Sequence, residues 1–217
     1  MATHSIHQHN FKVAKTARYS TIGSPLDQAE RVMIALHGYG QLPEFFLKKF
    51  TRLADQGWCI IAPEGFHRFY LDGTHGRVGA SWMTKEDRES DIADYVHYLD
   101  ALSDHLNLRN RKPVLLGFSQ GVATASRWVS SGQQSFEHLI LWAGVFPPDF
   151  QWKTGRDHLM HLRLDLVLGT EDPYFKDHLL TDTASLLDNM AVSYNLHRFS
   201  GGHAIDSDVL SEILASR

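Results

Sequence analysis

The sequence is poor in cysteine: Cys59 is the single thiol in 217 residues. One thiol cannot form an internal disulfide, so a reducing compartment is permitted. Cys59 lies in the apolar run 58–62, which predicts a small buried side chain rather than a reactive thiol.

Long apolar runs and blocks of one charge are absent too. No stretch approaches the roughly 18 apolar residues that a spanning helix needs, and residues 1–10 hold no apolar segment of a signal peptide. Lys and Arg number 21 against 25 Asp and Glu, and neither sign forms a block that would bind a phosphate backbone. We therefore expect a cytoplasmic protein without a nucleic-acid partner or stable membrane insertion. The sequence leaves the oligomeric state open, a homodimer included.

Apolar residues are plentiful and evenly spread, at 43% of the chain. No linker or internal repeat divides the sequence, which predicts a single domain over residues 1–217. Short apolar runs typical of strands buried on both faces recur along the chain, at 31–36, 58–62, 113–116, 138–143, 162–168 and 192–199.

Segments with helical periodicity separate these runs. They cover residues 86–106, 119–131, 174–190 and 206–216. Strand alternating with helix predicts an α/β fold with a mostly parallel central sheet and helices on both faces. The partly alternating residues 5–22 predict an antiparallel hairpin at the sheet edge.

One motif suggests nucleophilic chemistry. Gly117-Phe118-Ser119-Gln120-Gly121 fits G-x-S-x-G, directly after a predicted strand and at the start of a predicted helix, where a sharp turn exposes a serine hydroxyl. A Cβ at either glycine would clash in such a turn. The pattern favours Ser119 as a nucleophile over a glycine-rich connection with an incidental serine.

A serine nucleophile needs a base, and the base needs a carboxylate to orient it. Asp172 follows the predicted strand 162–168 and precedes Pro173, which holds it in extended geometry. Its neighbour Glu171 is the alternative, and capping of the next helix is the structural explanation for either residue.

The candidate base is His203. It lies in the flexible segment Gly201-Gly202-His203, between the strand 192–199 and the last helix, where a loop can carry an imidazole back over the sheet to Ser119. The competitor His197 lies within the strand pattern, so its side chain is less able to reach the serine.

The turn His37-Gly38-Tyr39-Gly40 offers donors for a developing oxyanion. It follows the strand 31–36, so the Tyr39 N–H could act together with the Gln120 N–H, the amide just after the serine. An ordinary glycine-rich turn is the alternative. His37 is then expected to be a structural hydrogen-bonding residue of the loop.

Together the segments HGYG, GFSQG, GTEDP and GGH resemble the α/β-hydrolase fold and, within it, the phospholipase/carboxylesterase family, which includes acyl-protein thioesterases. The resemblance implies a cofactor-free serine hydrolase without a cap domain. No metal is expected, because the spacing of His4, His7 and His9 in a polar terminus favours a solvated strand face over a metal site. It implies Ser119, Asp172 and His203 as the catalytic triad and Tyr39 and Gln120 as the oxyanion hole. Val122 and Gln41 depart from the thioesterase pattern, which has a second glycine and an acidic residue there.

The expected activity is hydrolysis of small-molecule carboxylic esters or thioesters through an acyl-enzyme. The alternatives are an acyl-protein thioesterase or lysophospholipase-type activity, lactone or carbon–carbon cleavage on the same triad, and a ligand receptor with slow turnover. Three aromatic residues are expected at the catalytic edge: Trp82 in the loop before the predicted helix 86–106, Phe146 after the strand 138–143, and Tyr174 after Asp172. They are expected either to line an apolar acyl pocket or to anchor loops.

Overall fold

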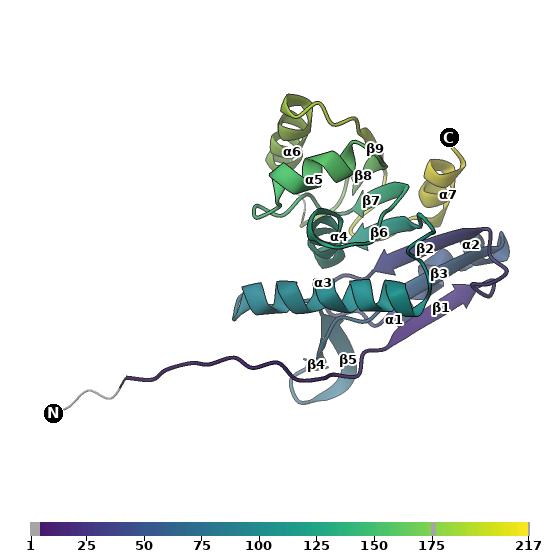
Figure 1. Cartoon of the computed structure of the whole chain (residues 1–217). Coiled ribbons are helices and arrows are strands. Elements are labelled where there is room, and N and C mark those ends of the chain that lie inside the picture. The colour runs from purple at the N-terminus through teal and green to yellow at the C-terminus, as the bar shows by residue number, and fades with distance from the viewer. Residues whose placement is uncertain (1–4, 175–176, 217) are drawn as a thin grey trace.

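In residues 5–174 and 177–216, which the computed structural model describes, a seven-stranded sheet forms the centre (Figure 1). Its order is β1-β3-β2-β6-β7-β8-β9. β1 is antiparallel to β3, and the other neighbours in this sheet run parallel. The strands are β1 (Tyr19–Gly23), β2 (Arg31–Leu36), β3 (Trp58–Pro63), β6 (Val114–Phe118), β7 (His138–Trp142), β8 (Arg163–Gly169) and β9 (Asn195–Phe199).

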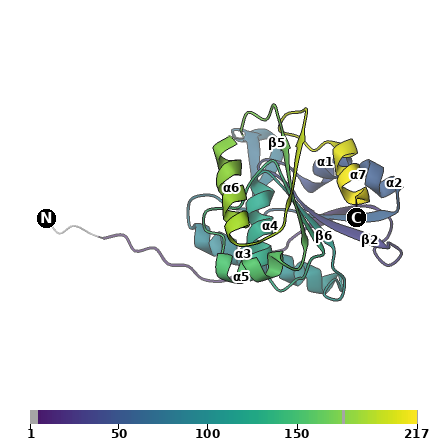
Figure 2. The same cartoon turned by 90° about the horizontal axis from the view of Figure 1, so that it is seen from above.

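Helices cover both faces of this sheet, as Figure 2 shows from above. Because side chains alternate along a strand, Ile34 and Leu36 of β2 pack into one apolar cluster while Met33 and Ala35 pack into the other. The first cluster is covered by α3 (Arg88–His105), α4 (Gln120–Ser131), α5 (Trp152–Leu159) and α6 (Asp177–Asn189). The second is covered by α1 (Pro43–Phe46), the 3-10 turn η1 (Leu47–Phe50), α2 (Thr51–Asp55) and α7 (Ser207–Ala215).

The predicted α/β architecture is therefore confirmed. Continuous apolar runs marked the central strands because these strands are buried on both faces. Cys59 lies inside β3 at 2% exposure, and burial raises the pKa of its thiol, as expected for a packed rather than a reactive cysteine. None of the helices in the described residues is long and apolar enough to cross a membrane.

The predicted N-terminal hairpin is wrong. β1 is an antiparallel edge strand, but residues 5–18 form no strand. The start of this segment extends away from the body of the molecule (Figure 1), whereas Asn10 bonds to Asp87 and Lys15 bonds to the Phe66 carbonyl. Ile6, Phe11 and Val13 are 99%, 86% and 72% exposed. Alternation alone did not make a strand here, because these side chains have no apolar face to cover.

An unpredicted hairpin instead joins β3 to α3. Its strands β4 (His67–Asp72) and β5 (His75–Ser81) form a separate two-stranded sheet. The end of β5 reaches the turn after β2, where the Gly40 N–H donates to the Ala80 carbonyl at 2.8 Å and the Ala80 N–H donates to the Gln41 carbonyl at 3.2 Å. The hairpin thus abuts the predicted oxyanion turn.

Candidate active site

Ser119 occupies a strained turn between β6 and α4. Its φ of 53° lies in a region that a non-glycine residue rarely adopts. A Cβ on Gly117 would lie 2.5 Å from the Gly121 carbonyl oxygen, and one on Gly121 would lie 2.2 Å from the Leu36 carbonyl oxygen. Both glycines are therefore needed for the turn, which carries the serine beyond the carboxyl end of the central strand β6.

The structure brings Ser119, His203 and Asp172 together in one hydrogen-bonded chain. Nδ1 of His203 lies 2.7 Å from Oδ2 of Asp172, and Nε2 of His203 lies 2.9 Å from Oγ of Ser119. An ionised carboxylate can only accept, so Nδ1 carries the proton and Nε2 accepts from the serine hydroxyl. The Asp172 carboxylate is fully buried, whereas the His203 side chain is 20% exposed.

Two loops position the acid and the histidine. They approach so closely that a Cβ on Gly169 would lie 2.3 Å from the Gly201 carbonyl oxygen. The Glu171 N–H donates to that same carbonyl at 2.9 Å, and the Trp142 Nε1–H holds the Ala204 carbonyl at 2.9 Å. The loop that carries His203 is thereby fixed on both sides.

The alternatives to Asp172 and His203 lie elsewhere. Glu171 is exposed and accepts a hydrogen bond from the Ser200 hydroxyl at 3.2 Å. His197 lies on β9, and its Nε2–H donates to Asp165 at 2.7 Å. Neither is bonded to Ser119 or to His203 in the part of the chain described, so the geometry favours the residues chosen from sequence.

The two candidate oxyanion donors come from adjoining segments. A Cβ on Gly38 would lie 3.0 Å from the Phe118 ring, so the turn after β2 lies against the serine turn. Within the described residues, no acceptor pairs with the N–H of Tyr39 or of Gln120. Gln120 opens α4, where the helix dipole adds a partial positive charge. The site thus offers two free N–H groups close to a serine.

The three aromatic residues expected at the pocket differ in position. Tyr174 is 77% exposed, and its ring centroid lies 4.9 Å from that of His203. Trp82 is 1% exposed and packs on the rings of His37 and Tyr95. Phe146 is 8% exposed and belongs to an aromatic cluster with Phe150 and Trp152. Tyr174 is thus open to a ligand, whereas Trp82 and Phe146 have the surroundings of anchoring residues.

Sequence reasoning missed two glutamine side chains. Oε1 of Gln41 accepts the Gly38 N–H at 2.8 Å. Oε1 of Gln120 accepts the Trp82 N–H at 3.1 Å, and its Nε2–H donates to the Met83 carbonyl at 3.0 Å. Gln41 acts within its own turn after β2, whereas Gln120 binds backbone groups at positions 82 and 83, and this long-range pairing has no signal in the sequence.

Potential metal ligands do not gather in this region. Across residues 5–174 and 177–216, no three or more His, Cys, Asp or Glu side chains are arranged to hold a metal ion.

Comparisons with known proteins place this site in context. Residues 17–216 match the family described as Phospholipase/Carboxylesterase. An esterase named PE8 has a similar structure, with a TM-score of 0.71 at 18% identity over 92% of this chain and 98% of the other. A carboxylesterase from Mesorhizobium loti gives 0.72 at 16% identity over 93% and 95%, and Zea mays acyl-protein thioesterase 2 gives 0.68 at 15% identity over 91% and 96%. At these identities the structural likeness establishes the α/β-hydrolase fold.

Proposed function

The chain belongs to the phospholipase/carboxylesterase family, and on that premise we propose that it is a serine carboxylesterase that cleaves carboxylic esters or thioesters. The observation that carries the proposal is the chain of hydrogen bonds from Ser119 through His203 to Asp172, at 2.9 Å and 2.7 Å. A hydroxyl, an imidazole and a buried carboxylate in this order are the groups that acyl transfer to serine requires.

The reaction begins when Ser119 Oγ attacks the acyl carbonyl carbon. Nε2 of His203 accepts the hydroxyl proton as the Oγ–C bond forms, and the carbonyl oxygen becomes an oxyanion. His203 then returns the proton to the departing alcohol or thiol, which leaves an acyl-serine. Water attacks this ester as His203 accepts its proton. The acyl–Oγ bond then breaks, His203 returns the proton to Oγ of Ser119, and the carboxylic acid is released.

Groups around the serine stabilise the charges that form in these steps. Asp172 holds the Nδ1 proton of His203 and stabilises the imidazolium that forms during attack. The N–H groups of Tyr39 and Gln120 stabilise the oxyanion, helped by the N-terminus of α4. His203 accepts the serine proton at Nε2, the atom that already accepts the hydrogen bond from Ser119.

A substrate screen tests this proposal. We would measure kcat/KM on p-nitrophenyl esters of graded chain length and on an acyl-thioester, with Ser119→Ala as the blank. Turnover of esters that Ser119→Ala abolishes supports the carboxylesterase. Preference for the thioester would instead favour the thioesterase alternative, and tight binding with negligible turnover would favour a receptor.

A further inference from the structure

The Gly38–Tyr39 peptide links a buried histidine to the candidate oxyanion hole. The carbonyl of this peptide belongs to Gly38, and its N–H belongs to Tyr39. In a trans peptide these two groups point in opposite directions. Whatever holds the Gly38 carbonyl therefore also sets the direction of the Tyr39 N–H.

His37 holds that carbonyl. Its Nδ1 lies 2.8 Å from the Gly38 carbonyl oxygen, and its Nε2 accepts the Gly65 N–H at 3.0 Å. Because Nε2 accepts, the proton is on Nδ1, which donates to Gly38. His37 is fully buried, and burial lowers the pKa of its imidazole to about 4. The ring is thus neutral, in the one tautomer that fixes the peptide.

Trp82 holds His37 in turn. The two rings are stacked with centroids 5.0 Å apart, and the Trp82 Nε1–H donates to the His37 carbonyl at 2.8 Å. Trp82 thereby restrains both the side chain and the backbone of the residue that precedes the peptide.

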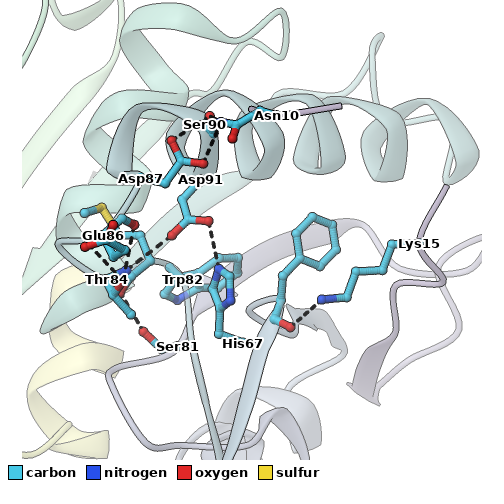
Figure 3. A network of polar contacts seen from close by, with 12 residues as sticks. Asn10, Lys15, His67, Ser81, Trp82, Thr84, Glu86, Asp87, Ser90 and Asp91 are labelled. Carbon is cyan, nitrogen blue, oxygen red and sulfur yellow. Dashed lines mark hydrogen bonds and ion pairs between the residues drawn. The ribbon is translucent and has the colours of Figure 1, made fainter. Parts of the chain in front are cut away.

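The segment that carries Trp82 is itself anchored on two sides. Its backbone N–H is bound by the side chain of Gln120, the residue with the second candidate oxyanion donor. Asp91 of α3 lies between Thr84 and His67 (Figure 3), with Oδ2 3.3 Å from the Thr84 nitrogen and Oδ1 3.0 Å from the His67 Nε2. The segment from Trp82 to Thr84 is therefore held by Gln120 on one side and by Asp91 of α3 on the other.

We infer that His37 and Trp82 are positioning residues that aim the Tyr39 N–H at the oxyanion, without touching the substrate themselves. This inference rests on the proposed function, because it assigns a task within the proposed acyl transfer. It also gives buried Trp82 a role other than lining an acyl pocket.

A pair of His37 variants separates positioning from simple packing. The amide nitrogen of Asn takes the place of Nδ1 and can donate to the Gly38 carbonyl. The amide of Gln takes the place of Nε2, where its oxygen can accept from the Gly65 N–H but no group reaches Gly38. Loss of an oxyanion donor costs about 10²- to 10³-fold in kcat. We expect His37→Gln to lower kcat at least about tenfold at nearly unchanged KM, and His37→Asn to recover most of that loss. Equal kcat in the two variants, or a larger loss in His37→Asn, would overturn the inference.

A matched tryptophan pair supplies a second measurement. Trp82 and Trp128 are both 1% exposed, and each donates its Nε1–H over 2.8 Å, Trp128 to Asp100. We expect Trp82→Phe to lower kcat at least about threefold, about 0.7 kcal/mol, at every acyl chain length, and Trp128→Phe to lower only the thermal midpoint. Equal kcat in both variants would contradict the assignment. If the unsubstituted protein hydrolyses no ester and Ser119 takes up no fluorophosphonate, the proposed function itself fails, and the inference with it.

Discussion

The structure contains two groupings of histidine and aspartate, one beyond the ends of β8 and β9 and one inside the sheet, and they differ in their other bonding partners. Beyond the carboxyl ends of β8 and β9, Asp172 binds one histidine, whose other nitrogen faces the hydroxyl of Ser119. Inside β7, β8 and β9, Asp165 accepts from both His138 and His197 and pairs with Arg163. Both aspartate side chains are fully buried. A buried histidine–aspartate pair therefore does not define a site. A nucleophile on a strained turn and unpaired N–H groups beside it are also needed.

The largest expected effect concerns the nucleophile. Ser119→Ala should lower kcat on p-nitrophenyl esters by about 10⁴-fold or more, because the acyl-enzyme cannot form. The thermal midpoint should change little, since the substitution leaves only a small cavity. Ser200→Ala is the control, because Ser200 is exposed at the same edge and binds Glu171. Near wild-type turnover by Ser119→Ala would remove the nucleophile assignment.

Exchanging each aspartate for asparagine tests the comparison directly. Asp172→Asn should lower kcat about 10³- to 10⁴-fold, because an amide no longer fixes the His203 tautomer. Asp165→Asn should instead lower the free energy of unfolding by about 3 kcal/mol or more, since it leaves Arg163 without its buried partner. Its kcat, measured well below its thermal midpoint, should stay close to that of the wild type.

Urea unfolding and steady-state kinetics on both variants measure these two effects. Glu171→Gln is the control for the acid loop and should be nearly silent in both assays. Two results would contradict this assignment. One is an Asp172→Asn variant that loses stability but keeps its kcat, and the other is an Asp165→Asn variant that loses kcat but keeps its stability.

His37 differs from the histidines of both groupings, because its two ring nitrogens bond to backbone groups, the Gly38 carbonyl and the Gly65 N–H. An unfolded imidazole takes up a proton below its ordinary pKa of 6.5, whereas folded His37 does so only near pH 4. Between these values the unfolded chain binds more protons, so the free energy of unfolding falls as the pH falls. At about 1.4 kcal/mol per pH unit, this group accounts for about 3 kcal/mol across that window.

The pH dependence is isolated by comparison with a variant. Urea unfolding from pH 7 to pH 4 should give a steeper decline for the wild type than for His37→Asn, which has no proton to bind at this position. Parallel curves for the two proteins would show that burial does not hold His37 neutral.

Asp165 should act at lower pH. Burial alone would raise the pKa of its carboxyl, but hydrogen bonds from His138 and His197 and the pairing with Arg163 outweigh it and hold the pKa well below the ordinary value of 3.8. The stability that the carboxylate contributes is thus present above pH 3.8 and is lost as the pH falls below it. In acid unfolding, the wild type should lose its advantage over Asp165→Asn in that range. A constant difference would contradict this account.

The smallest effect concerns the exposed rim of the site. Tyr174 stands beside His203 and is open to solvent, so contact with an acyl chain should contribute roughly 0.8 kcal/mol per buried methylene. Tyr174→Ala should lower kcat/KM a few-fold on medium-chain esters and less on acetate. A chain-length profile unchanged by this substitution would remove Tyr174 from the substrate contacts.

The comparison also shows why the sequence predicted some features and not others. Runs such as 113–116 and 162–168 belong to strands buried on both faces, so composition alone marked the central strands and, with them, the turns that carry Ser119 and Asp172. The hairpin β4–β5 was missed because most of it is exposed and no apolar pattern distinguishes it from a loop. The direction of Trp82 was inaccessible too, because its place in a loop before a helix does not say that its ring turns inward onto His37.

Chemical trapping of the nucleophile tests the central claim most directly. The wild-type protein and Ser119→Ala are treated with an alkyl fluorophosphonate, and the modified peptide is identified by mass spectrometry. We expect one adduct, on Ser119, that forms as esterase activity disappears, forms far more slowly in Asp172→Asn, and is absent from Ser119→Ala. An adduct on another residue, or full loss of activity with Ser119 unmodified, would contradict the account.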